Sequence, residues 1–237
     1  MTAKSFQRFY KDTGIAAVES GFEVQLDRRT VKTPHARANL VVPSRPLAEA
    51  MAREWDEQGE TVRPDRMPLT ALAFTAHDVA VPQRDGLVEG LVRYADTDLV
   101  CYLAPEPPQL VERERRLWHP LLDWLALTYD APLTTTEGIL PIAQPAETKQ
   151  ALATAVDRLD AMRLAALSSS TRAAGSLVVG LALLEGRLDA AAAFDTAEVE
   201  RTYQIEQWGE DSDAAEERDG IRRDLDAAER FLTLLAG

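Results

Sequence analysis

The sequence predicts an α+β protein in which a small, mainly β N-terminal domain with one helix precedes an all-helical C-terminal domain. Two patterns favour this fold class. Apolar and polar residues alternate within the first 45 residues, and apolar residues recur at helical spacing from there on. A hydrophobic content of 46% is sufficient for a sizeable core. We place the two domains at residues 1–75 and 76–237.

Three short strands are expected in the N-terminal domain. Residues 22–26 (Phe-Glu-Val-Gln-Leu) alternate between apolar and polar side chains, as in a half-buried strand. The polar break at 27–29 and the β-branched residues of 30–34 predict a hairpin. A third strand at 40–42 ends before Pro43, which cannot donate to a β-ladder.

Helices are expected after these strands. Ser44 is a suitable N-cap for a helix with Pro46 in its first turn, and Gly59 ends that helix. Pro120 is expected to kink or split the helix predicted at residues 110–129. The apolar character of 164–185 predicts a buried central helix. The further helices are predicted at residues 68–80, 83–95, 110–129, 146–163, 164–185, 189–208 and 214–235, with a loop at 132–145.

Composition excludes several classes of protein. Asp and Glu total 39 against 26 Lys and Arg, so a net charge of −13 argues against binding to nucleic acid. The single cysteine, Cys101, excludes an intramolecular disulfide, and three dispersed histidines leave little for a metal site. The last quarter is the most acidic part, since 185–237 holds 15 acidic and 6 basic residues.

The chain shows no signal peptide and no apolar run long enough to span a bilayer. We therefore expect a soluble protein of the bacterial cytoplasm, or of the mitochondrial matrix if a transit segment has been removed. No cofactor, metal, small-molecule substrate or membrane insertion is expected, and the free protein is expected to be a monomer.

An enzymatic reading is the alternative. Cys101 could act as a nucleophile with His77 and Asp78, and the pair Asp96 and Asp98 could carry acid–base chemistry. However, Cys101 lies in an apolar run where a free cysteine usually packs as a small hydrophobe. An Asp-x-Asp sequence at a helix boundary is typical of capping.

The four tryptophans and one helical segment are further candidates. All four, Trp55, Trp118, Trp124 and Trp208, are predicted to pack in the core or between the domains, and as a group they could anchor an interface. Trp55 and Asp56 are placed at the domain junction. If residues 194–208 form one helix, it has two apolar stripes with polar residues between them. The first stripe consists of Phe194, Ala197, Ile205 and Trp208, the second of Val199 and Tyr203, and Glu200 and Gln204 lie between. Such a helix is either sandwiched inside the domain or presents one stripe to a partner.

Seven phrases, in order, resemble the F1-ATPase assembly chaperones that act on the alpha subunit of ATP synthase. They extend over almost the whole chain. The phrases are Arg8-Phe9-Tyr10-Lys11, residues 26–34, 54–58, 67–70 and 97–102, Trp118-His119-Pro120-Leu121-Leu122-x-Trp124, and Glu200-x-x-Tyr203-Gln204-Ile205-x-x-Trp208-Gly209. The chain departs from the family pattern at two positions. Arg28 stands where the family usually has the glycine of a hairpin turn, and His119 stands where it usually has an aspartate.

The resemblance implies an ATP-independent chaperone, not an enzyme. It would bind the unassembled F1 alpha subunit and prevent its aggregation until the beta subunit takes over. The resemblance places client binding on the helical domain, and Glu200 is the first candidate for a polar contact. The other client-binding residues implied are Tyr203, Gln204, Glu206 and Trp208. A generic holdase without a preferred client is a second alternative.

Overall fold

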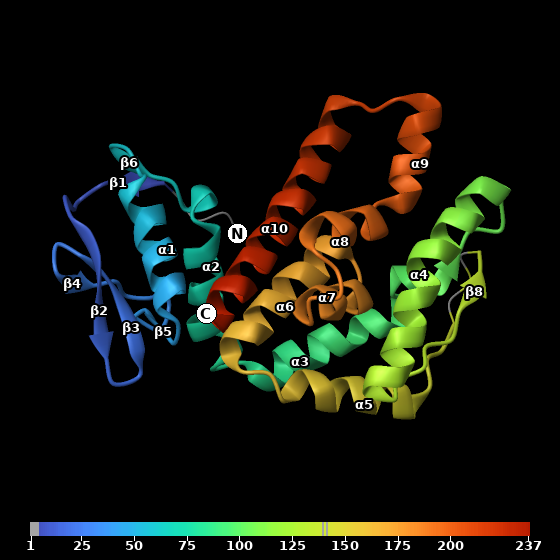
Figure 1. Cartoon of the computed structure of the whole chain (residues 1–237), viewed down its shortest axis with the longest axis horizontal. Helices are drawn as coiled ribbons and strands as arrows, with labels where there is room; N and C mark the ends of the chain where they lie inside the picture. Colours follow the sequence, from blue (N-terminus) through green and yellow to red (C-terminus); the bar gives the residue numbers. More distant parts are fainter. Residues whose placement is uncertain (1–4, 139, 141) are drawn as a thin grey trace. The chain divides into compact units, whose positions relative to one another are not determined.

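The computed structural model describes residues 5–138, 140 and 142–237, which form two compact units. The first unit contains the described residues up to Arg84 together with 161–166 and 227–237. The second contains 85–160 and 167–226. The first unit is discontinuous in sequence because Met162 and Phe231, from two later helices, are buried in its core. The α+β class with N-terminal strands and C-terminal helices is confirmed (Figure 1).

A small antiparallel sheet forms one side of the first unit. Its central strand β3 (Gly21–Leu26) pairs with β2 (Thr13–Val18), β4 (Arg29–Thr30) and β5 (Val41–Val42). The alternation at 22–26 therefore predicts the central strand correctly, but sequence patterns do not single out β2. The predicted strand at 30–34 is shorter than expected, because pairing beyond Thr30 is limited to a bridge between Lys32 and Asn39. A separate pair joins β1 (Phe6–Gln7) to β6 (Thr61–Val62).

The turn between β3 and β4 confirms the predicted hairpin. Asp27 and Arg28 occupy its two central positions with φ angles of 49° and 63°, as a type I′ turn requires. Arg28 thus adopts a left-handed conformation that glycine adopts more easily. Asp27 Oδ1 accepts hydrogen bonds from the backbone N–H groups of Lys11 (3.0 Å) and Asp12 (2.9 Å), which holds the preceding segment against the turn.

Helix α1 (Arg45–Asp56) packs on β2 and β3, as Figure 1 shows. Ser44 is its N-cap, as predicted, and accepts a hydrogen bond from Leu47 N at 3.4 Å. Near the other end, the buried carboxylate of Glu54 accepts the backbone N–H groups of Leu69 and Thr70, each at 2.8 Å. These N–H groups belong to the first turn of α2 (Pro68–Thr75), so Glu54 fixes α2 to α1. A short 3₁₀ turn (Pro64–Arg66) precedes α2, and a π-helical turn (Ala76–Ala80) follows it.

The second unit is built mainly of helices. The principal ones are α3 (Arg84–Val92), α4 (Pro108–Tyr129), α5 (Ala146–Asp157), α7 (Leu177–Leu184), α8 (Ala190–Ala197) and α9 (Val199–Trp208). Two helices contribute to both units, α6 (Ala161–Ala174) and α10 (Ser212–Ala236). Two 3₁₀ turns (Arg93–Thr97 and Leu99–Cys101) follow α3, and strands β7 (Tyr102–Leu103) and β8 (Thr136–Glu137) form a short parallel pair. All eight residues of α7 are buried, as the apolar run predicted.

Two predicted helices are each divided in the structure. The predicted helix 164–185 breaks at Gly175, whose φ of 65° leaves the helical region, and Ser176 then caps α7. The predicted helix 189–208 breaks at Glu198, where φ and ψ are −103° and 15°. The first apolar stripe is therefore wrong, because Phe194 and Ala197 lie in α8 and the 100° spacing does not carry across the break. The second stripe, Val199 and Tyr203, lies within α9.

Of the two effects predicted for Pro120, a kink or a split, the split does not occur in α4. The helix runs without interruption from Pro108 to Tyr129. Proline removes one helical hydrogen bond, that to the carbonyl four residues earlier, at Arg116. Both Pro120 and Arg116 are exposed, so water can satisfy the freed carbonyl. Within the described part of the chain, no helix has the length and apolar character needed to span a membrane.

Candidate functional site

Helix α9 is held against α4 by a charged and aromatic contact. The Arg113 guanidinium on α4 forms two short contacts with the Glu206 carboxylate, Nη2 to Oε2 at 2.7 Å and Nη1 to Oε1 at 3.0 Å. It also lies 5.3 Å from the centre of the Tyr203 ring. The hydrogen bond to Arg113 lowers the pKa of Glu206 below its usual value. Because bidentate pairing fixes both partners in one geometry, it orients the last turn of α9.

A pair of carboxyl groups joins the same two helices near the start of α9. Glu114 on α4 is fully buried, and its Oε2 accepts the backbone N–H of Ala104 at 2.8 Å. Its Oε1 has no donor among the described residues, and the carboxyl group facing it is that of Glu200. Burial, followed by the charge of Glu200, raises the pKa of Glu114 to about 7. Protonation of Glu114 removes the repulsion between the two carboxyl groups and lowers the cost of burying Glu114.

Ion pairs with α10 hold the other side of α9. Arg218 donates to Glu198 Oε2 (3.2 Å), Glu210 Oε1 (3.0 Å) and Thr202 Oγ1 (2.9 Å), so it links both ends of α9. Arg201 on α9 adds an ion pair with Glu217 at 3.1 Å. Contacts on two sides thus restrict α9 to one position, and side chains that point away from α4 and α10 are presented on a rigid element.

Trp208 is the most conspicuous of these outward side chains. It is 79% exposed at the last position of α9, immediately before Gly209, so the prediction that Trp208 packs in the core is wrong. Gln204, one turn earlier, is also exposed. The structure therefore divides the five residues of the predicted client site. Glu200, Tyr203 and Glu206 interact with α4, although Glu200 and Glu206 remain exposed. In contrast, Gln204 and Trp208 are exposed side chains that form no hydrogen bond, ion pair or ring contact with α4 among the described residues.

The other tryptophans and Asp56 have partners within their own units. Trp55 is buried edge-on to Tyr10, with ring centres 5.8 Å apart, and Asp56 lies 3.7 Å from Arg8. Trp118 is buried and donates from Nε1 to the carbonyl of Thr196 at 3.0 Å. Trp124 is half-buried and stacks edge-on with Tyr129, 5.6 Å away.

The enzymatic candidates are engaged in structural contacts. Asp98 is fully buried and accepts hydrogen bonds from Ser176 Oγ (2.5 Å) and Leu177 N (2.8 Å), which places it at the N-terminus of α7. Asp96 instead pairs with Lys149 at 3.0 Å. In the other unit, Asp78 accepts from Thr33, His35 and Ala36, and His77 Nε2 lies 2.8 Å from the carbonyl oxygen of Val41. Among the described residues no His, Cys, Asp and Glu side chains are grouped for metal binding.

The Cys101 thiol provides a direct test of the enzymatic alternative. It is fully buried, and burial together with the charge of Asp98 raises its pKa to about 12. Because only the thiolate is reactive, we expect a thiol reagent at neutral pH to modify the native protein very slowly and the unfolded protein rapidly. Rapid modification of the native state would contradict this expectation and support a catalytic cysteine.

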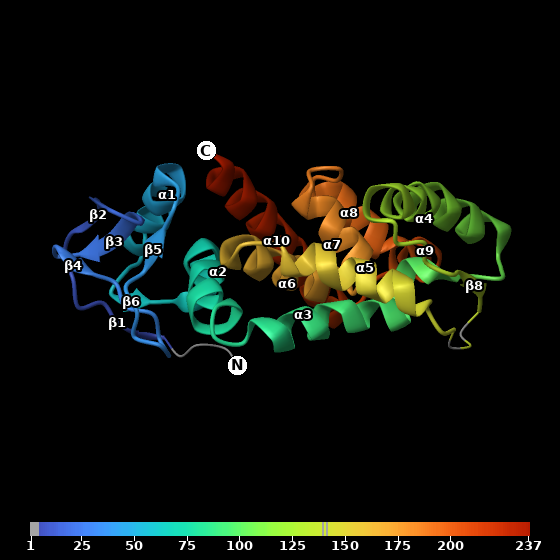
Figure 2. The same ribbon diagram turned by 90° about the horizontal axis from the view of Figure 1, so that it is seen from below.

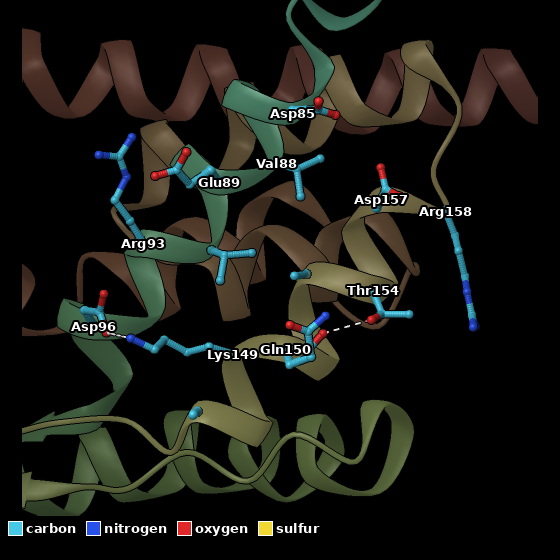
Figure 3. Close-up of a pocket in the computed structure, with 13 residues that line it drawn as sticks. Asp85, Val88, Glu89, Arg93, Asp96, Lys149, Gln150, Thr154, Asp157 and Arg158 are labelled. Atoms are coloured by element: carbon cyan, nitrogen blue, oxygen red, sulfur yellow. Dashed lines mark hydrogen bonds and ion pairs between the residues drawn. The ribbon is translucent and has the colours of Figure 1, made fainter.

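The second unit also contains a cleft between α3 and α5, which run side by side in Figure 2. This cleft has a volume of about 670 Å³, and the Asp96–Lys149 ion pair crosses it (Figure 3). Arg93 and Arg158 extend away from each other at its two sides in Figure 3. Its lining mixes acidic and basic side chains, and it holds no paired nucleophile and base among the described residues.

Comparison with known proteins identifies the family. The model of the family described as ATP12 chaperone protein matches residues 7–126, which is just over half of the chain. The chain belongs to the ATP12 chaperone family. The resemblance deduced from the seven sequence phrases is therefore confirmed at the level of the family. Family membership also supports a chaperone rather than an enzyme.

Individual relatives of the ATP12 family agree over most of the length. Protein atp12, mitochondrial, from Schizosaccharomyces pombe is 30% identical over 224 residues, covering 90% of this chain and 77% of the relative. The crystal structure of Atp12 from Paracoccus denitrificans is 36% identical, with a TM-score of 0.89 and coverage of 97% of this chain and 98% of that one. A point mutant of P. denitrificans Atp12p gives a TM-score of 0.90 at the same identity and covers 97% of both chains.

Local sequence patterns do not identify the residues that hold α9 in place. Arg113 and Glu114 lie in a run of five charged residues, 112–116, which looks like a solvated surface. A signal was present, because Glu114 lies one turn from Leu110 and one turn from Trp118, on the face that is buried in the structure. No comparable local pattern marks Arg218, since its partners come from a helix and loop that precede it in the chain.

Proposed function

We propose that this protein is an ATP-independent chaperone that binds the unassembled alpha subunit of F1-ATPase and prevents its aggregation before it assembles with the beta subunit. Subunits of obligate complexes carry large apolar interfaces, which aggregate while they are unpaired. A chaperone of this type needs no nucleotide, because the beta subunit can release the client by competing for the same surface. The protein would act where F1 is assembled, in the bacterial cytoplasm or the mitochondrial matrix.

The observation that carries this proposal is the exposed Trp208 on a helix fixed from both sides. Tryptophan is prominent among the residues that dominate protein–protein affinity, and a rigid support reduces the entropy lost on binding. Its sequence neighbours are acidic, since Glu206, Glu210 and Asp211 lie within three positions. Because Glu206 and Glu210 already pair with Arg113 and Arg218, this surface suits a partner with an apolar pocket rather than a strongly basic one. The acidic charge of −13 would also keep the complex dispersed.

Co-expression with the F1 alpha and beta subunits, each alone, tests the client. We expect affinity capture of this protein to recover alpha and not beta. Unrelated unfolding proteins added in the same assay should not be protected equally, because equal protection is what a generic holdase predicts. Recovery of neither subunit, or aggregation of alpha in the presence of excess chaperone, would refute the proposal.

Substitution of Trp208 tests the surface. Truncation of an anchoring aromatic residue typically costs 2 kcal/mol or more of binding, so Trp208→Ala should reduce capture of alpha by about 30-fold or more. Leu127→Ala is the matched control, because Leu127 is another large apolar residue of the same unit and is 88% exposed. Both variants should unfold at the temperature of the parent protein. An equal loss with Leu127→Ala would show that the effect is not specific to α9.

Glu200→Lys tests the polar contact. A lysine at this position would face the buried Glu114 carboxyl and could pair with it, so the fold should be retained. We expect client protection to be lost, because the charge presented beside α9 is reversed. Loss of the helical signal or of the cooperative thermal transition would show instead that Glu200 has only a structural role.

A further inference from the structure

The first unit contains an apolar groove whose lining includes no residue of α9. It has a volume of about 850 Å³, within the range of peptide and small-molecule sites. Its lining comes from β1, β6 and α2, labelled in Figure 1, and from the segment that follows β3. Phe9, which is 71% exposed, and the partly exposed Phe6 and Phe74 form much of the apolar surface. Large exposed aromatic residues grouped around a groove indicate a binding surface.

Three cations line the same groove. Arg29, Lys32 and Arg37 are exposed, and within the described part of the chain none of them forms an ion pair. Lys32 donates only to the neutral side-chain oxygen of Asn39. The one acidic residue of the lining, Asp27, directs Oδ1 to the backbone N–H groups of Lys11 and Asp12. The groove is therefore locally basic on a chain whose net charge is −13.

One residue of the lining carries a buried hydrogen-bond donor without an acceptor. Trp55 is 5% exposed, and its Nε1–H has no partner among the described residues. This N–H is inaccessible to solvent, so it is not part of the surface that a ligand in the groove would touch. The accessible donors of the groove are its cations, and an extended peptide offers them backbone carbonyl groups, whereas a hydrocarbon chain offers none.

We propose that this groove binds an extended segment of the client whose apolar side chains are flanked by carboxylates. The inference rests on the proposed function for the identity of the client, but the groove itself points to the chemistry of the segment. In an extended chain alternate side chains face opposite ways, so apolar residues can enter the groove while acidic ones meet Arg29, Lys32 and Arg37. An anionic membrane would instead be repelled by the acidic remainder of the chain.

Charge reversal of the rim is the decisive experiment. The probes are two short fluorescent peptides, one alternating leucine and glutamate and the other alternating leucine and lysine, titrated into the full-length protein. We expect the glutamate peptide to bind at least about tenfold more tightly. The double variant Arg29→Glu/Arg37→Glu should reverse this preference. Arg53→Glu, an exposed charge on α1 outside the groove, should leave it unchanged.

The apolar contribution is tested separately. Phe9→Ser should weaken both peptides, because it removes an exposed aromatic ring from the groove without disturbing the core. Val18→Ser is the matched control, an exposed apolar residue at the end of β2 that does not line the groove. Far-ultraviolet circular dichroism and thermal unfolding of each variant verify that the fold is retained.

Several results would overturn the inference. These are equal binding of the two peptides, no effect of the rim variant, or binding of fatty-acid vesicles in place of peptide. Self-association of the protein that Arg29→Glu/Arg37→Glu abolishes would assign the groove to a second copy of the chain. Capture of the alpha subunit without peptide binding would refute the groove alone, whereas peptide binding without capture of alpha would refute the proposed client.

Discussion

Replacement of Asp98 by alanine is expected to destabilise the protein by about 3–5 kcal/mol, enough to unfold many domains of this size. The carboxylate is fully buried and accepts hydrogen bonds from Ser176 Oγ (2.5 Å), Leu177 N (2.8 Å), Val178 N (3.2 Å) and Val100 N (3.4 Å). Alanine would leave these donors buried without an acceptor. It would also remove a negative charge from the N-terminus of α7, which the helix dipole favours.

Urea denaturation followed by circular dichroism measures this loss. Asp96→Ala is the matched control, because Asp96 belongs to the same Asp-x-Asp sequence but is partly exposed and pairs only with Lys149. We expect Asp96→Ala to cost less than about 1 kcal/mol. If the two substitutions had similar effects, or if Asp98→Ala left stability unchanged, the hydrogen bonds of Asp98 at the N-terminus of α7 would not contribute to stability as we predict.

The Asp98 cap also explains why helix boundaries in the second unit could be predicted only in part. Local chemistry at 175–176 is sufficient for a break, since glycine and serine are a common helix end and start. However, the apolar run on both sides favours one continuous helix. The carboxylate that stabilises the N-terminus of α7 belongs to Asp98, which lies 78 residues before Ser176 in the chain. A one-dimensional pattern does not contain that contact.

Elements with a strong local signal were predicted well. The Ser44 cap, the alternation in β3 and the apolar run of α7 each depend on neighbouring residues, and each is present in the structure. Strand β2 was missed because its sequence, Thr-Gly-Ile-Ala-Ala-Val, has small residues and little alternation. It forms because it pairs with the whole length of β3, which is a contact between two elements and not a property of either.

The candidate site shows the same division. The apolar pattern of 194–208 points to the segment that ends at Trp208, but the break at Glu198 separates Phe194 and Ala197 from the face of α9 that the pattern assigns to them. The orientation of Glu200 and Glu206 depends on Glu114 and Arg113, which lie some 86 and 93 residues earlier on α4. Sequence patterns therefore identified which helix to examine, and the tertiary contacts decide which of its side chains are free to bind a partner.

Substitution of Glu114 by glutamine is expected to increase stability at pH 8 and to have little effect at pH 5. Burial and the charge of Glu200 raise the pKa of Glu114 to about 7 in the folded protein, above its ordinary value of 4.5. Folding therefore favours the protonated form, and the stability that this form contributes is complete below about pH 4.5 and is lost as the pH rises through 7. One pKa unit corresponds to about 1.4 kcal/mol, so the ionised group costs on the order of 3 kcal/mol at pH 8.

Glutamine reproduces the protonated carboxyl at every pH. Its carbonyl oxygen can accept the N–H of Ala104, and its neutral amide places no second negative charge beside Glu200. Urea denaturation at pH 5 and pH 8 measures the difference between variant and parent. Asp98, whose pKa is raised to about 6 mainly by burial, remains in the variant and will preserve part of the pH dependence.

Glu206→Gln is the control, because it is expected to change stability at pH 8 in the opposite direction. Its hydrogen bond with Arg113 lowers the pKa of Glu206, so the stability it contributes is present above its unfolded pKa and is lost as the pH falls. This variant should be less stable than the parent at pH 8, whereas Glu114→Gln should be more stable. If Glu114→Gln were instead destabilised at pH 8, Glu114 would have to be ionised and satisfied in the folded protein, and the burial of its protonated form would be excluded. We therefore expect the contact between α4 and α9 to weaken above about pH 7, where Glu114 loses its proton beside Glu200.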